Sequence, residues 1–426
     1  MKRHLFVFFC VILLGACSDR SLSLFNPDYV NDTPKNASIE NALKRAFQIS
    51  QIKWTPLKEV PNNSGFYSPG IQVQGMPYSS VKELDKFVGL EVSFQTFMTA
   101  VHNPRSVLYT EDVGKKPYHG KNCASYYGVV CSSVVNYALG LSINYVTASL
   151  DTLSFFSRVQ RQTPEDIELC DVLWSPGHEV MIYNIVRKIS DSSIKEVSIL
   201  ESAGISTHIK TYTIKEFEKR WKEDGWVLYR YNDLYRDIPY EPNPFVPIKG
   251  ESLEQFQYND IICPSRGDNA VYREGEEIVI NVLNKSFVNI ELYRDNQLIS
   301  SRRTNTLDVI YSNLEYGGYM AIASDDKGDK SDTIHFDVVD TNVKINNLGQ
   351  EIIVSFNSNY GHPVYVKLCN EYGGLVAIRP LTEEEIIAES VKIPIQTTKA
   401  KDSYCKVFFS TPNGMVTNEP IKINSK

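Results

Sequence analysis

Hydrophobic residues recur at helical spacing in two segments of the first half of the chain. The apolar positions from Phe94 to Val101 are separated by three or four residues, and so are those from Cys131 to Ala138. Gly140 follows the second segment at the place where helices commonly end in a left-handed residue. We therefore predict two amphipathic helices over these segments.

A further helix and two strands are predicted downstream. Thr213 and Glu216 have the spacing of a capping box at the start of a helix. Residues 178–186 and 196–201 are strand-like and are joined by a polar turn at 190–193. Helices packed against a small antiparallel sheet give an α+β domain.

The second half of the chain has a different period. From residue 250 onward, short runs of alternating apolar and polar residues are separated by turn residues, which is typical of half-buried strands. We predict two all-β sandwich modules of immunoglobulin-like size, 250–340 and 341–426, with a boundary near Asp340. The proline-rich stretch 238–249 is predicted to be a stiff linker that follows an α+β domain over 39–237.

The N-terminus has the pattern of an export signal. Basic residues precede an apolar run from Leu5 to Ala16, which is too short to span a bilayer and is followed at once by Cys17. This pattern resembles the lipobox of bacterial lipoproteins, so 1–17 is expected to be a lipoprotein signal peptide that is cut to leave Cys17 as the new N-terminus with a lipid anchor, and 18–38 a polar tether. The alternative is a plain signal peptide. The resemblance implies a cell-envelope protein held in the outer membrane, on its periplasmic or surface face.

Charge and cysteine content narrow the possible partners. A net charge of -7 leaves no basic stripe for nucleic acid, so we expect no nucleic-acid partner. Six cysteines remain after Cys17, and their spacing is not that of a disulfide-stapled mini-domain or of paired zinc ligands. Cys369 with Cys405, or Cys123 with Cys170, could pair, and the sequence does not decide between paired and free thiols.

Three residues of the α+β domain form a candidate catalytic set. Cys131 opens a predicted helix, where backbone N–H groups and the helix dipole favour a thiolate and where its own N–H could help to hold an oxyanion. A thiolate nucleophile needs an imidazole and a third group that orients it. If the strands at 178–186 and 196–201 form a hairpin, then His178 and Glu201 lie side by side at its open end.

Other residues compete for these roles. A cysteine on a helix face is often only a small core residue, and a histidine at a strand start is often structural. Cys123 is the second candidate nucleophile, because basic residues surround it. His102, His119 and His208 are alternative bases.

Several segments resemble the NlpC-type cell-wall peptidases of the papain-like superfamily. The segment 127–140, with Cys131 and Ser132 at the start of its helix, is similar to the family's nucleophile segment. Residues 171–173 and 177–182 are similar to its Gly-Asp-Leu strand and its His-Val segment, and 75–78 is similar to its Gly-x-Pro-Tyr. The motifs occur in the family's order within Gly75–Tyr231.

This resemblance implies a papain-like fold and hydrolysis of amide bonds in peptidoglycan stem peptides or wall fragments, with no metal and no organic cofactor. It implies Cys131 as nucleophile, His178 as base and Glu201 as orienting residue, a place where the family more often has His, Asn or Gln. Tyr78, Tyr127 and Ser132 become candidate substrate-binding residues.

The chain departs from the family at two positions beside the nucleophile. Val130 stands where the family has Asp, and Ser133 replaces a Gly. About fifty residues separate Tyr78 from Cys131. These departures leave the substrate specificity open.

Two rival functions come from other classes. The chain could be a non-catalytic surface lipoprotein that binds glycan or protein through its sandwiches, with Tyr293, Tyr316 and Tyr319 as candidate contacts. It could also transfer acyl or thioester groups with the same Cys and His. The sequence leaves the oligomeric state open.

Overall fold

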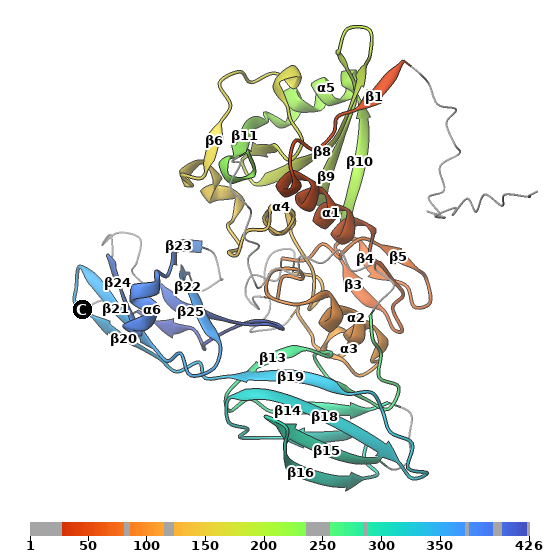
Figure 1. The fold of residues 1–426 in the computed structure, drawn as a ribbon, viewed down its shortest axis with the longest axis vertical. Helices are drawn as coiled ribbons and strands as arrows, with labels where there is room; N and C mark the ends of the chain where they lie inside the picture. The colour runs from red at the N-terminus through yellow and green to blue at the C-terminus, as the bar shows by residue number, and fades with distance from the viewer. Residues whose placement is uncertain are drawn as a thin grey trace, which may run out of the picture.

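The computed structural model describes residues 28–80, 86–114, 123–235, 256–283, 288–370, 375–394 and 403–423. Figure 1 shows three bodies: an N-terminal unit of 28–235 at the top, a sandwich at the bottom, and a second sandwich at the left. The predicted signal peptide 1–17 with Cys17, the linker 238–249 and His119 lie outside the described residues.

The N-terminal unit contains five α-helices and three short 3₁₀ helices among its described residues. The α-helices are α1 (Ala37–Gln51), α2 (Phe94–His102), α3 (Val107–Thr110), α4 (Cys131–Leu139) and α5 (Ile214–Asp224). The 3₁₀ helices are η1 (Thr147–Thr152), η2 (Pro164–Asp166) and η3 (Asn232–Tyr235).

A seven-stranded sheet is the central element of this unit. Its strand order is β10-β9-β8-β7-β11-β6, and β1 also pairs with β8. Its strands are β1 (Tyr29–Asn31), β6 (Phe156–Arg158), β7 (Val172–Ser175), β8 (His178–Lys188), β9 (Ile194–Ala203), β10 (Ser206–Thr213) and β11 (Val227–Tyr231). Two small hairpin-like pairs complete the unit: β2 (Lys53–Trp54) with β5 (Val73–Gln74), and β3 (Val60–Asn62) with β4 (Gly65–Tyr67).

The structure confirms the helices and the hairpin predicted for this unit. α4 begins at Cys131 and ends at Gly140, whose φ of 78° is the left-handed value that favours glycine. α5 begins after Thr213, whose side chain accepts the Glu216 N–H as the capping box requires. β8 and β9 pair antiparallel around a turn in which Ser192 has a φ of 59°.

α4 is buried between α1 and the sheet. All nine of its residues are buried, because it packs on α1 on one side and on β8 and β9 on the other. Arg45 of α1 donates from Nε to the carbonyls of Tyr137 and Ala138 at 3.1 and 2.9 Å. These contacts fix the last turn of the helix and, through it, the position of Cys131 at the other end.

The first sandwich is built from two sheets that share one core. One sheet has three strands, β12 (Ile262–Pro264), β14 (Ile278–Val282) and β17 (Asp308–Tyr311); the other has five, β13 (Ala270–Arg273), β15 (Val288–Arg294), β16 (Gln297–Thr304), β18 (Gly317–Asp325) and β19 (Ile334–Val339). Ile280 and Tyr311 from the first sheet pack with Leu292 and Phe336 from the second. The predicted β-sandwich is confirmed for this segment.

The second sandwich has the same two-sheet arrangement. Its sheets are β20 (Val343–Asn347), β21 (Glu351–Phe356) and β24 (Ser390–Pro394), against β22 (His362–Cys369), β23 (Leu375–Pro380), β25 (Tyr404–Thr411), β26 (Gly414–Thr417) and β27 (Ile421–Lys422), with α6 (Glu383–Ile387) between β23 and β24. Val354 and Ile393 of one sheet pack with Val366 and Val407 of the other. A β-sandwich is confirmed for this segment too.

The sandwiches contact the N-terminal unit directly. The N–H groups of Val107 and Met415 donate to the carbonyls of Ser265 and Glu91, both at 2.8 Å. Ile143 of the N-terminal unit shares a small buried cluster with Tyr365, Phe408 and Met415. The three bodies therefore pack against one another.

The predicted tether differs from the structure over its second half. Of 18–38, residues 28–38 are described, and Tyr29–Asn31 form β1, paired antiparallel with Val186–Lys188 of β8. The Nζ of Lys195 lies 3.9 Å from the centre of the Tyr29 ring. The polar composition that predicted a tether did not reveal this pairing, because an edge strand can be largely exposed.

The described part of the chain contains six cysteines and no disulfide between them: Cys123, Cys131, Cys170, Cys263, Cys369 and Cys405. Neither of the two disulfides left open by the sequence is formed. In the described part of the chain, no helix has both the length and the apolar character needed to cross a bilayer.

We expect Asp171→Ala to destabilise the N-terminal unit. Asp171 is fully buried and accepts two 2.8 Å hydrogen bonds from Arg230, so its loss should cost about 2–4 kcal/mol, somewhat less than for a fully buried pair because the Arg230 side chain is 25% exposed. Urea unfolding followed by tryptophan fluorescence measures this unit selectively, since all 4 tryptophans lie in it. Glu165→Ala, at an exposed site, is the control; equal stability of both variants would contradict the expectation.

Candidate active site

Cys131 is held at the first turn of α4. Val130 precedes the helix in an extended conformation, and its N–H donates to Ser133 Oγ at 2.7 Å. As the first residue of the helix, Cys131 has no intrahelical acceptor for its own N–H. Its side chain is only 7% exposed, so the sulfur sits in a largely desolvated position at the positive end of the helix dipole.

His178 reaches the thiol from the start of β8. Gly177, with a φ of 90°, makes the turn from β7, and Ser175 pairs with His178 across the hairpin. The imidazole hydrogen-bonds the Cys131 side chain, and its Nε2 lies 2.8 Å from Glu201 Oε1. The structure thus brings together the three residues predicted to form the catalytic set.

Glu201 accepts hydrogen bonds from two side chains. It lies on β9 directly opposite His208 of β10 and is 5% exposed. Besides His178, it binds Arg220 of α5, whose Nη2 and Nη1 donate to Oε1 and Oε2 at 2.5 and 3.0 Å. This bidentate pair compensates the burial of the carboxylate.

The thiol and the imidazole shift each other toward the charged state. Burial raises the pKa of Cys131, but the hydrogen bond and positive charge of His178, with smaller contributions from Thr147 and the Glu179 N–H, lower the pKa below its ordinary value. Burial lowers the pKa of His178, whereas Cys131 and Glu201 together raise it to about 9. Each group therefore favours the charged form of the other, a thiolate beside an imidazolium.

Glu201 stays ionised because its contacts with His178 and Arg220 outweigh the effect of burial on its pKa. Burial raises its pKa, but the hydrogen bonds of His178 and Arg220 and their positive charges lower it to about 2. The pKa of Arg220 is raised by the same carboxylate. A charged acceptor therefore faces the imidazole across the physiological pH range.

Thr147 is a further polar contact of the sulfur. Its Oγ1 lies 3.7 Å from Cys131 Sγ, and its carbonyl accepts the Trp174 Nε1–H at 2.8 Å. The indole thus fixes the backbone of η1 beside the thiol. Nothing in the sequence marked Thr147, because it lies sixteen residues after Cys131, beyond the end of α4.

Glu179 is a second acid beside the site. Burial raises its pKa well above the ordinary range, and the negative charge of Cys131 raises it further, so both favour the protonated carboxyl. It is 2% exposed, and its Oε2 has no hydrogen-bond partner among the described residues. The only feature of the sequence that pointed to Glu179 was its position next to His178.

The structure places two of the three predicted substrate-binding residues near the sulfur. Tyr78 is partly buried and close enough to Cys131 that the thiolate contributes, after burial, to raising the Tyr78 pKa. Ser132 is the second residue of α4 and is 4% exposed. Both assignments remain predictions.

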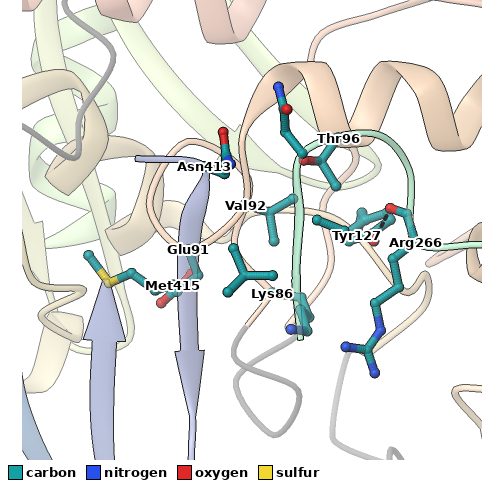
Figure 2. A pocket seen from close by; sticks show the side chains of 11 residues that line it. Lys86, Glu91, Val92, Thr96, Tyr127, Arg266, Asn413 and Met415 are labelled. Atoms are coloured by element: carbon teal, nitrogen blue, oxygen red, sulfur yellow. Dashed lines mark hydrogen bonds between the residues drawn. The ribbon is translucent and has the colours of Figure 1, made fainter. Parts of the chain in front are cut away.

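Tyr127 lies in a different environment. Its ring is 1% exposed, and its hydroxyl donates to the Arg266 carbonyl at 2.7 Å. Figure 2 shows this contact in a hollow that Glu91 of the N-terminal unit shares with Met415 from the second sandwich and with residues of the first. Residues of all three bodies line this hollow, so the Tyr127 hydroxyl lies at the contact between them. Neither Cys131 nor His178 is among these residues.

Of the competing residues, His208 borders this arrangement. Cys123 is partly buried, and the ring of His102 lies against Tyr258 at an interplanar angle of 58°, with centroids 4.0 Å apart. His208 Nε2 lies 3.7 Å from Glu201 Oε2, on the side of the carboxylate that Arg220 also occupies. Within the described ranges, no group of His, Cys, Asp or Glu has the arrangement of a metal site.

Comparisons with known proteins give no family. No protein-family model matches the sequence, and no curated protein matches it. Solved structures with some likeness include fibronectin(III)-like modules of CbhA from Clostridium thermocellum (16% identity, 39% of this chain and 94% of that chain, TM-score 0.20). Others are the BSP domain of a biofilm-associated protein (10%, 72% and 53%, 0.17) and extracellular domains 3–5 of Drosophila OTK (9%, 36% and 62%, 0.15). TM-scores of this size do not establish a shared fold.

We expect iodoacetamide to label Cys131 faster than Cys123 or Cys170 at about pH 7. Cys170 is fully buried with a raised pKa, whereas His178 stabilises the Cys131 thiolate. His178→Ala should slow labelling of Cys131 about ten-fold or more, the effect of one pKa unit, with a smaller difference above pH 9. Peptide mapping by mass spectrometry gives the rates, His102→Ala is the control, and equal labelling of the three thiols would contradict the assignment.

Proposed function

We propose that this protein is a cysteine hydrolase that cleaves amide bonds in cell-wall peptides, with Cys131 as nucleophile, His178 as base and acid, and Glu201 as the orienting residue. The observation that carries the proposal is the continuous contact from the Cys131 thiol through the imidazole to the Glu201 carboxylate, 2.8 Å from His178. This order of nucleophile, base and acid is the arrangement that thiol hydrolases require.

The chemistry follows from the charges of the resting pair. The Cys131 thiolate attacks the amide carbon, and a C–S bond forms as the carbonyl π electrons move to oxygen. The Cys131 N–H at the start of α4 is placed to hold this oxyanion. The imidazolium of His178 then gives its proton to the leaving amine as the C–N bond breaks, which leaves a thioester and a neutral imidazole.

Water completes the cycle. The neutral His178 imidazole takes a proton from water as the oxygen attacks the thioester, and the C–S bond breaks to release the acid and restore the thiolate and imidazolium. Glu201 keeps the imidazole in one orientation through both steps and stabilises its positive charge. No metal and no organic cofactor is used in these steps.

The substrate class is supported by the resemblance to NlpC-type peptidases. The segments that carry it supply the parts of the site: 127–140 gives the thiol, 177–182 the imidazole, and 75–78 places Tyr78 near the sulfur. A papain-like fold of the N-terminal unit belongs to the same proposal. Peptidoglycan stem peptides or wall fragments would be available to a protein anchored in the envelope through Cys17.

We expect Cys131→Ala to abolish release of free amines from defined muropeptides, because Cys131 supplies the sulfur of the proposed thioester. Products are read by mass spectrometry, and Cys123→Ala is the matched control that should keep activity. If the wild-type protein releases no amine from any wall fragment but binds glycan, the non-catalytic binding function replaces this proposal. Undiminished release by Cys131→Ala would move the nucleophile elsewhere.

We expect kcat/KM to fall as pH rises through about 9, because the leaving amine needs the proton of the His178 imidazolium and the pKa of His178 is raised to about 9. Glu201→Gln removes one of the negative charges that raise this pKa, so the alkaline limb should move to lower pH. His102→Ala should leave the limb in place. A limb that stays fixed in Glu201→Gln would show that Glu201 does not act on His178.

A further inference from the structure

We infer that Arg220 is a positioning residue of the Cys131 site, which holds Glu201 as a fixed, ionised acceptor for the His178 imidazole. The inference rests on the proposed function for its catalytic meaning. The series of contacts from Arg220 through Glu201 and His178 to Cys131 does not depend on that function.

The guanidinium of Arg220 is fixed on every side. Two of its nitrogens donate to Glu201 at 2.5 and 3.0 Å, Nη1 also donates to the Tyr212 hydroxyl, and Nε donates to Asp224 at 3.0 Å. Its plane lies over Trp226, 4.9 Å from the ring centre. A guanidinium held in this way presents a rigid fork, which restricts the carboxylate to one orientation.

The two acids flanking His178 show what the arginine does. Glu201 and Glu179 are both nearly fully buried, at 5% and 2% exposed, yet the pKa of Glu201 is lowered to about 2 and that of Glu179 is raised well above its ordinary range. Glu201 has Arg220 and His178 as partners, whereas Glu179 Oε2 has no partner among the described residues. Burial without a hydrogen-bonded cation favours the protonated carboxyl, so Arg220, together with His178, favours the charged form of Glu201.

The other charged groups around Glu201 do not replace Arg220. From β8 comes His178, from β10 come His208 and Tyr212, and from α5 comes Asp224. His208 Nε2 is 3.7 Å from Glu201 Oε2, beyond hydrogen-bond distance, and its side chain is 40% exposed. Tyr212 and Asp224 are uncharged and negative respectively, and both bind Arg220.

The fork also ties the site to α5. Arg220 lines an open groove between β10 and α5, together with His208, Lys210 and Glu216. Its position depends on α5, which is fixed by the buried side chains of Phe217 and Trp221. The orientation of the catalytic imidazole is therefore set by the docking of a helix that carries none of the three reacting residues.

The test uses Arg220→Met, which keeps the apolar stem over Trp226 and removes the charge, and Arg220→Lys, which keeps the charge and removes the fork. Lys219→Met, at the neighbouring exposed position with its side chain 74% exposed, is the matched control. Two quantities are measured: the alkylation rate of Cys131 against pH, and the pKa of Glu201 by carbon-13 NMR of the carboxyl group.

In Arg220→Met, the Glu201 pKa should rise by about one unit or more, and the acid limb of the alkylation profile should move up with it. Arg220→Lys should leave both near the wild-type values but lower kcat/KM about ten-fold, because the carboxylate is no longer held in one orientation. Lys219→Met should match wild type. A folded Arg220→Met with an unchanged Glu201 pKa and alkylation profile would overturn the inference.

A double-mutant cycle separates positioning from folding. If Arg220 acts through Glu201, then Arg220→Met added to Glu201→Gln should change kcat/KM by much less than it does in the wild type. Equal effects in both backgrounds would show that Arg220 supports only the fold. Because alkylation and NMR need no wall substrate, failure of this inference is distinguishable from failure of the proposed hydrolase function, which the muropeptide digest tests alone.

Discussion

A buried carboxylate shared by two cations is the interaction on which the site depends. Glu201 could not remain charged at 5% exposure without donors on both of its sides, and it receives them from His178 and Arg220. The same charge lets the imidazole hold its proton, and the proton in turn lets Cys131 ionise. Each charge in the series is stabilised by the next, so the site favours a thiolate although Cys131 is only 7% exposed.

Much of this arrangement could be predicted from the sequence, because it follows from local rules. Cys131 was placed at a helix start by the period of the residues after it, and His178 and Glu201 were brought together by a hairpin whose turn is polar. Arg220 and Thr147 could not be found in the same way. That a buried acid needs a cation is a general rule, but the sequence contains 44 lysines and arginines, and only tertiary packing selects one of them.

The fold, too, was predictable from the sequence only in part. Alternation of apolar residues predicted both sandwiches, since a strand with one buried face must keep a period of two. It did not predict β1, whose three residues pair with β8 at the edge of the sheet. Nor did it predict how the bodies pack: the hollow of Figure 2, where the hydroxyl of Tyr127 meets the backbone of Arg266, is made by residues far apart in the sequence.

The contact of Ile143 and Glu91 with the second sandwich has a consequence for the synthesis of the chain. Ile143 is buried against Tyr365, Phe408 and Met415, and the Met415 N–H binds the carbonyl of Glu91. The ribosome makes Ile143 more than two hundred residues before these partners. The loop between α4 and Thr147 therefore lacks part of its support until the strands of the second sandwich have been made.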